Sequence, residues 1–206
     1  MDIQFYGANC ISVTHKSGRI IIDDNLVDLG AKSITKADDV VLFTGAHGQA
    51  AGRLTFDSPG EYEVADTSVV GIPARAHIDE PGTVNATMFK LVTGEHSMLV
   101  TGHIYPELSD TQLETIGMVD VLIVPVGGSG YTVDPVGALK LIKAIEPKFV
   151  VPVHYEDKAL KFPVPQLSLA AALKELGMEP KETVSKLKIK RDELSDVTQL
   201  VILEKS

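Results

Sequence analysis

The first half of the chain alternates short apolar runs with turn signals, and this pattern predicts a series of consecutive β-strands. Glycine, proline and small polar residues separate the runs, as in Ser58-Pro59-Gly60. The predicted strands are Ile3–Tyr6, Cys10–Thr14, Arg19–Ile22, Val40–Phe43, Leu54–Phe56, Tyr62–Val64, Ser68–Ile72, Thr87–Leu91 and Met98–Thr101.

The hydrophobic period changes in the second half, where helical spacing alternates with buried strands. Ser109 and Gln112 form a capping-box pattern, and Asp134-Pro135 provides an N-cap followed by a first-turn proline. The predicted helices run from Ser109 to a C-terminal cap at Gly117, from Asp134 to about Ile145, and over roughly Leu167–Leu176. The predicted strands are Val119–Val126, Phe149–Val153, Lys186–Lys190 and Leu200–Leu203. Strands first and helix–strand units afterwards predict a layered α/β fold, with residues 1–206 forming one domain.

The composition is that of an ordinary globular protein, with 44% hydrophobic and 23% charged residues among 206. No apolar run approaches the ~18 residues that cross a bilayer, so we expect no membrane partner. The N-terminus has no signal-peptide pattern, and a single cysteine, Cys10, fits a reducing compartment. We therefore expect a cytoplasmic protein in which Cys10 is a core residue.

The net charge of −9 argues against a nucleic-acid partner, because binding to phosphates requires a local excess of Lys and Arg. One basic cluster is present near the C-terminus, and its spacing is typical of the solvated face of a strand. Its members are Lys181, Lys186, Lys188, Lys190 and Arg191.

A loop with a single histidine follows the predicted strand Val40–Phe43. It reads Thr44-Gly45-Ala46-His47-Gly48-Gln49-Ala50. This setting resembles the one in which metallo-β-lactamase-fold hydrolases place a His-x-His-x-Asp-His motif. By that resemblance, only His47 matches the motif. The first His, the Asp and the last His are replaced by Gly45, Gln49 and Ala50.

Further segments resemble the same superfamily in order along nearly the whole chain. They are Tyr6-Gly7-Ala8-Asn9-Cys10, Ile21-Ile22-Asp23, Ser58-Pro59-Gly60-Glu61-Tyr62-Glu63-Val64, Gly71-Ile72-Pro73, Val124-Pro125-Val126-Gly127-Gly128 and Val151-Pro152-Val153-His154-Tyr155. The nearest likeness is to small single-domain hydrolase-like proteins related to the L-ascorbate-6-phosphate lactonase group. The resemblance implies an αβ/βα four-layer sandwich with mixed sheets and a metal cleft along one edge.

The resemblance also assigns four histidines to ligand positions, namely His47, His77, His103 and His154. His103 stands where the superfamily has the carboxylate that bridges two metals. Without that carboxylate and the Asp replaced by Gln49, repulsion between two cations is poorly screened, so we expect no bimetal centre. One divalent ion (Zn, Ni or Fe) bound by the four histidines is compatible with their chemistry, and so is a metal-free cleft.

The resemblance places Asp23 behind the metal ligands. Gln49 lies in or near the cleft, and the sequence leaves open whether its side chain points into it. Tyr105 and Tyr155 follow two of the histidines closely and could line it, although packing is the favoured interpretation for both. A glycine-rich stretch at residues 127–130 is expected at the cleft mouth, with Tyr131 and Thr132 near any ligand.

The leading functional hypothesis is a hydrolase-like protein whose metal site has degenerated and which keeps a ligand-binding or interaction role. One alternative is a hydrolase of an ester, lactone or phosphodiester that uses a single metal, with His103 as a ligand or as a catalytic general base. Another is a structural subunit of a homo-oligomer. The sequence leaves open whether the protein is an enzyme.

Overall fold

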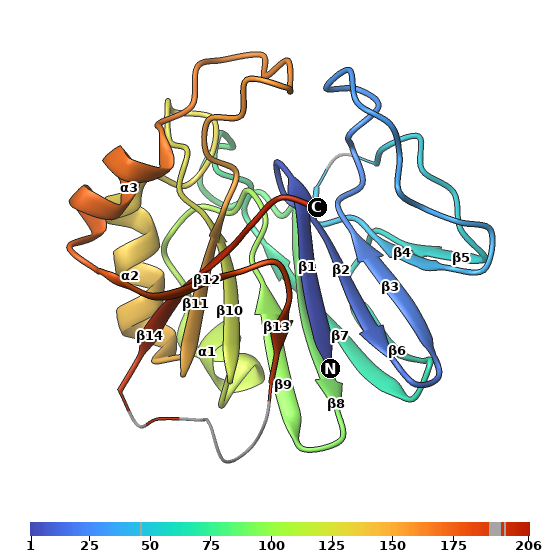
Figure 1. Ribbon diagram of the computed structural model, residues 1–206. Helices are drawn as coiled ribbons and strands as arrows, with labels where there is room; N and C mark the ends of the chain where they lie inside the picture. The colour runs from blue at the N-terminus through green and yellow to red at the C-terminus, as the bar shows by residue number, and fades with distance from the viewer. Residues whose placement is uncertain (46, 190–194, 196) are drawn as a thin grey trace.

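The computed structural model describes residues 1–45, 47–189, 195 and 197–206. Two mixed β-sheets face each other (Figure 1). The smaller sheet has the order β13-β1-β2-β3-β4-β5. Its strands are β1 (Asp2–Gly7), β2 (Cys10–His15), β3 (Gly18–Ile22), β4 (Val40–Leu42), β5 (Leu54–Phe56) and β13 (Leu187–Lys188). β1 to β3 are antiparallel, whereas β3, β4 and β5 are parallel neighbours.

The larger sheet has eight strands in the order β12-β14-β11-β10-β9-β8-β7-β6. They are β6 (Gly60–Val64), β7 (Thr67–Ala74), β8 (Ala86–Thr93), β9 (His96–Val100), β10 (Val121–Pro125), β11 (Phe149–Val153), β12 (Pro180–Val184) and β14 (Gln199–Leu203). β6 to β9 form an antiparallel meander, and β9, β10, β11 and β14 are parallel. The α/β class and the mixed sheets predicted from the sequence are confirmed.

The main core lies between the two sheets and follows from the two-residue period of the strands. Ile11 and Val13 of β2 point into it together with Phe89 and Leu91 of β8, and all four side chains are buried. Cys10, between the turn and Ile11, points to the opposite face and is fully buried there. Its predicted role as a core residue is confirmed.

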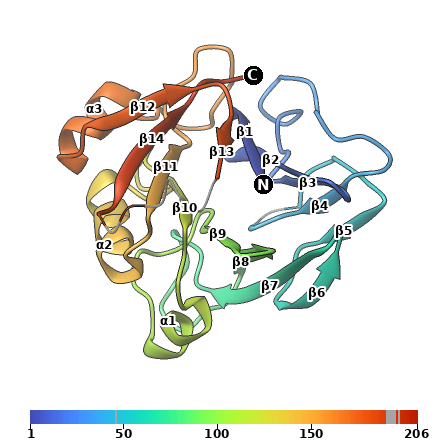
Figure 2. The ribbon, with the colours of Figure 1, turned by 60° about the horizontal axis from the view of Figure 1, so that its bottom comes forward.

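Three helices of the described chain cover the outer face of the larger sheet (Figure 2). They are α1 (Asp110–Ile116), α2 (Pro135–Ile145) and α3 (Leu169–Leu176). The predicted capping box is present, since the Ser109 side chain accepts from Gln112 N and the Gln112 side chain accepts from Ser109 N. The Asp134 side chain caps α2 by accepting from Gly137 N, and the Ser168 side chain caps α3 by accepting from Ala171 N.

Loop segments, not helices, cover the outer face of the smaller sheet. Asp24 organises the segment after β3, because its Oδ2 accepts from Ser33 Oγ, Ile34 N and Thr35 N at 2.6–3.0 Å. Leu26 and Leu160 then pack on Cys10 from two different loops. The segment between β3 and β4 therefore lies over the smaller sheet, and it contributes Asp28 and Leu29 to the cavity described below.

The sequence pattern missed β12, because three of its five residues are polar and four are exposed at the sheet edge. Lys190 and Arg191 of the basic cluster lie outside the described residues. Within the described ranges, no helix is long and apolar enough to cross a bilayer.

Candidate functional site

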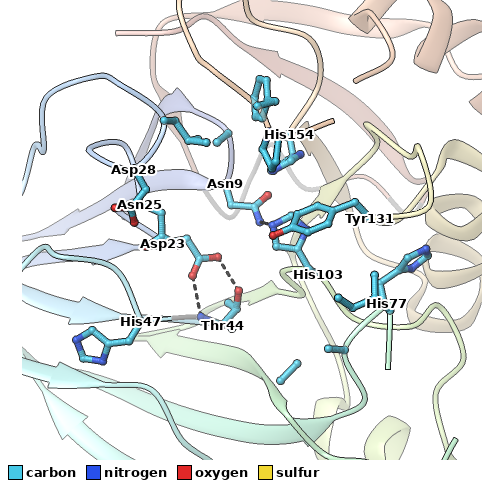
Figure 3. A pocket seen from close by; sticks show the side chains of 18 of the residues that line it. Asn9, Asp23, Asn25, Asp28, Thr44, His47, His77, His103, Tyr131 and His154 are labelled. Carbon is cyan, nitrogen blue, oxygen red and sulfur yellow. Dashed lines mark hydrogen bonds between the residues drawn. The ribbon is translucent and has the colours of Figure 1, made fainter. Parts of the chain in front are cut away.

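A cavity of about 480 Å³ opens at the edge where strand ends of both sheets meet (Figure 3). Asp23 and Thr44 follow β3 and β4, whereas His103 and His154 follow β9 and β11. Since each of these strands pairs in parallel within its sheet, their carboxyl ends bring these side chains to one edge. The turn between β1 and β2 adds Asn9.

Three non-glycine residues that line the cavity have a left-handed backbone. Their φ angles are +48° at Ala8, +53° at Asp23 and +55° at His154. Backbone hydrogen bonds hold two of them, since His154 N donates to Ala8 O at 2.8 Å and Asp23 N donates to Leu42 O at 2.9 Å. Strain of this kind, on the order of 1–3 kcal/mol a residue, concentrates at functional sites.

The His154 ring is fixed in one tautomer by a chain of hydrogen bonds. Gln166 Nε2 donates to Val164 O at 3.0 Å, which leaves Gln166 Oε1 as an acceptor 3.1 Å from His154 Nδ1. The proton of the neutral ring is therefore on Nδ1, and Nε2 carries a lone pair. Among the described residues, none hydrogen bonds to that Nε2.

Both nitrogens of His103 are engaged. Nδ1 lies 2.6 Å from Thr132 Oγ1, and Nε2 lies 3.0 Å from Asn9 Nδ2. The ring meets His154 edge-on, with 4.5 Å between the ring centroids. Burial lowers the pKa of His103 to about 3, and it lowers the pKa of His154 to about 4. Both rings are therefore uncharged at neutral pH, and His103 is a weak proton acceptor for the general-base role predicted from the sequence.

Asp23 is fully enclosed beside Thr44. Its Oδ1 accepts from Thr44 N at 2.7 Å, and its Oδ2 accepts from Thr44 Oγ1 at 2.6 Å. Burial raises the pKa of Asp23 to about 6, although the two Thr44 hydrogen bonds oppose the shift. Thr44 in turn connects the sheets, because its carbonyl accepts from Thr87 N of β8 at 2.8 Å.

Asp23→Asn is expected to flatten the pH dependence of folding. The folded pKa of about 6 exceeds the ordinary value of 3.8, so the stabilising contribution is complete below pH ~4 and is lost as the pH rises through ~6. Well above pH ~6, the free energy of unfolding has lost this whole contribution, which is roughly 3 kcal/mol. Asn has a similar shape and tolerates the left-handed backbone, but it cannot ionise. Urea denaturation between pH ~4.5 and ~8 measures the difference, with Asp38→Asn as an exposed control. Parallel profiles for Asp23→Asn and the wild type would contradict the assigned pKa.

His47 lies apart from the other histidines. Its Nδ1 is 3.0 Å from Asp57 Oδ2, its ring stacks on Phe43 with centroids 4.6 Å apart, and its side chain is 50% exposed. Gln49 is not among the described residues that line the cavity. Instead, its Nε2 donates to Oδ1 of Asp28, which does line it, at 2.9 Å. The sequence left open whether Gln49 faces the cleft, and the structure places it behind the cavity wall, in contact with Asp28.

His77 lines the cavity from the loop after β7, and its amide donates to His103 O at 2.7 Å. Its buried Nδ1 has no hydrogen-bond partner among the described residues.

Tyr105 is not among the residues that line the cavity, and the Arg75 guanidinium lies 3.4 Å above its ring centroid. Tyr155 packs on Phe5 with centroids 5.7 Å apart. Packing, the favoured interpretation of both tyrosines, is what the structure shows.

Sequence reasoning missed several residues of the site. Asn9 was part of a recognisable segment, but nothing indicated that its amide would meet His103. Gln166 gave no signal at all. Tyr131 and Thr132 were predicted near the cleft, and the structure places Tyr131 in the cavity wall and Thr132 behind His103.

The family of the chain follows from comparison with known proteins. The sequence pattern of the beta-lactamase superfamily domain matches residues 2–154, a span that contains all four predicted ligand positions. The chain belongs to the metallo-β-lactamase superfamily. The narrower likeness to the L-ascorbate-6-phosphate lactonase group stays a prediction.

Individual superfamily members agree with this placement. A protein assigned as a Zn-dependent hydrolase from Thermotoga maritima has 25% identity and a TM-score of 0.74, over 98% of either chain. A metallo hydrolase from Ignicoccus hospitalis shares the fold at 18% identity and a TM-score of 0.60, over 85% of this chain and 90% of its own. A protein named metal-dependent hydrolase from Carboxydothermus hydrogenoformans is 35% identical over 71 residues. That match covers 34% of this chain and 31% of the relative's length.

The side chains present do not fit the two-metal centre of the superfamily. In the described parts of the chain, no three His, Cys, Asp or Glu side chains come together as a metal-binding group. Ala50, which the resemblance places at the last ligand position of the motif, packs against Val41 and Phe43. The structure brings His103 and His154 together, but it does not gather the four histidines into one ligand set. Metal binding by those four residues stays a prediction.

Proposed function

We propose that this superfamily member binds a small molecule in the cavity without a two-metal centre. One observation carries the proposal: Asn9 and Thr132 occupy both nitrogens of His103. His103 stands at the position of the bridging carboxylate, and as a buried neutral ring it supplies no negative charge there. If His103 turned away to bind a metal, the side chains of Asn9 and Thr132 would lose their hydrogen bonds to it, at a cost of about 1–3 kcal/mol for each buried polar group left unpaired.

The size and lining of the cavity support a ligand-binding role. Its volume of about 480 Å³ lies within the range of ~300–1,000 Å³ common for small-molecule sites. Apolar walls from Leu29 and Phe162 surround a polar inner end with Asn9 and His154. This combination of apolar walls and a few fixed polar groups favours a compact organic ligand.

A single-metal hydrolase is the second candidate. The contact between the rings of His103 and His154 favours it, and so do the names of the relatives from Thermotoga maritima and Carboxydothermus hydrogenoformans. A zinc, nickel or iron ion would need free imidazole nitrogens, of which the described geometry offers His154 Nε2 and His77 Nδ1. His103 and His47 would have to exchange their present partners for the ion.

Elemental analysis of protein purified without a histidine tag tests these two candidates. After incubation with zinc, nickel or iron, we expect well below about one ion per chain. A content of about one ion that is lost in His103→Ala, but kept in His15→Ala, would overturn the proposal in favour of the metal-dependent hydrolase. The alternative role as a structural subunit of a homo-oligomer is tested by light scattering on the same sample, which measures the molar mass in solution.

A further inference from the structure

The charged residues around the cavity are mainly acidic. Asp23, Asp28 and Asp79 line it, and Lys161 is the one cation among the described lining residues. No described cation forms an ion pair with Asp28 or Asp79, and Oδ2 of Asp79 has no hydrogen-bond partner in the described part of the chain. Lys161 is exposed, so its ammonium can extend into solvent. The electrostatic potential inside therefore favours a cation over an anion.

Aromatic rings form part of the same wall. Phe162 lies against His154 with ring centroids 5.0 Å apart, and Tyr131 meets His103 edge-on at 5.4 Å. Both aromatic residues line the cavity. The face of an aromatic ring attracts an ammonium group, and the ring also provides an apolar surface for the rest of a ligand. Aromatic rings beside carboxylates that have no cationic partner are typical of sites for organic cations.

Asn9 is an independent sign of a missing hydrogen-bond donor. It is 4% exposed, lines the cavity and gives its Nδ2 to His103, but its buried Oδ1 has no partner among the described residues. Figure 3 shows this amide beside His103 and below His154. A buried carbonyl oxygen without a donor carries an energetic cost, which a ligand N–H group would relieve.

We propose that the cavity takes an organic ammonium ion with an apolar body, and that it excludes anionic ligands such as phosphates. The acidic wall that includes Asp28 and Asp79 attracts the ammonium charge, and Asn9 Oδ1 accepts from an N–H group of the ligand. The apolar body lies against Phe162 and Tyr131. The inference rests on the proposed function, because it assumes a cavity that takes its ligand without a metal.

Three probe compounds that share a phenyl ring but differ in charge test whether the cavity prefers a cation, a neutral molecule or an anion. They are 2-phenylethylamine, 2-phenylethanol and phenylacetate, titrated calorimetrically into the full chain in EDTA. We expect the amine to bind about tenfold or more tightly than the alcohol, and phenylacetate to give no measurable binding. The amine affinity should fall as salt increases, because Asp28 is exposed to solvent.

Asp28→Asn/Asp79→Asn tests the assigned carboxylates. The double variant is expected to weaken amine binding about tenfold and to leave alcohol binding unchanged. Asp38→Asn/Asp110→Asn changes the net charge equally at positions outside the cavity wall, so it should bind the amine like the wild type.

The outcomes separate this inference from the proposed function. Equal binding of amine and alcohol in EDTA, or no binding of any probe, would overturn the ammonium assignment and leave the metal analysis to decide the proposed function. Phenylacetate binding that appears only when zinc replaces EDTA would overturn both. An equal loss of amine binding in the two double variants would show a general charge effect and overturn the roles of Asp28 and Asp79.

Discussion

Gly45→His combined with His103→Asp is expected to give the chain a zinc site of about one ion. Among the described native residues, no three His, Cys, Asp or Glu side chains come together as a metal-binding group. By the superfamily resemblance, the variant would place three imidazoles and one carboxylate at the ligand positions of a single metal. The new imidazole has room, because a Cβ built on Gly45 meets no atom within 4 Å and residue 45 lines the cavity. His47 and His77 supply the other two nitrogens.

The main structural change that this variant requires is a rotation of His47. Its pairing with Asp57 lies at the surface, with both side chains about half exposed, and a pair of that kind contributes ~0–1 kcal/mol. Structural zinc sites contribute on the order of 10 kcal/mol, so zinc binding readily offsets the loss of that pair. His103→Asp also releases Asn9 and Thr132, which would then hydrogen bond to the carboxylate or to water.

Gly45→Gln combined with His103→Asn is the matched control, because it adds similar side chains that are poor zinc ligands. Elemental analysis after dialysis measures how much zinc each variant retains. The melting temperature with and without zinc measures how much the bound ion stabilises the fold. We expect zinc to raise the melting temperature of the His/Asp variant and not that of the Gln/Asn control. A His/Asp variant that folds by circular dichroism yet retains no zinc would contradict the assignment of these ligand positions.

Local patterns in the sequence were sufficient for most elements of the fold. The capping box at Ser109 and the Asp134-Pro135 start of α2 were predictable because each depends on residues a few positions apart. The strands of the core were predictable from apolar runs between turns. β12 was not predictable, because its mostly exposed residues form no apolar run. Backbone pairing with β14 holds this strand at the sheet edge.

The candidate site was less predictable because its contacts join distant segments. The resemblance singled out His103 and His154 as candidate site residues, and the structure brings their rings together. It could not show that Asn9, 94 residues away from His103, would occupy one of its nitrogens. Hydrogen bonds of this kind depend on how two sheets pack, and a single sequence carries no direct signal of that packing.

Gly102→Ala is expected to be among the most destabilising single substitutions in the chain, with a loss of roughly 3–7 kcal/mol in the free energy of unfolding. Gly102 has φ +63°, a conformation that costs alanine about 1 kcal/mol. The added Cβ would also overlap the side chain of Thr44. Thr44 has little freedom to move away, because it donates twice to buried Asp23 and accepts from Thr87. Overpacking there adds about 1–3 kcal/mol, and a broken hydrogen bond to Asp23 adds a further ~1–3 kcal/mol.

Gly94→Ala separates the packing effect from the backbone effect. Gly94 has a similar φ of +60°, but a Cβ built there meets no atom within 4 Å. Its substitution should cost only about 1 kcal/mol, the penalty of the left-handed conformation alone. Denaturant unfolding of both variants measures the difference. Losses of equal size would mean that Thr44 and Asp23 can relax, and that the buried link between β3, β4 and β8 at the inner end of the cavity is not rigid. A much larger loss for Gly102→Ala would show that this glycine is required by the close approach of Thr44, independently of any ligand.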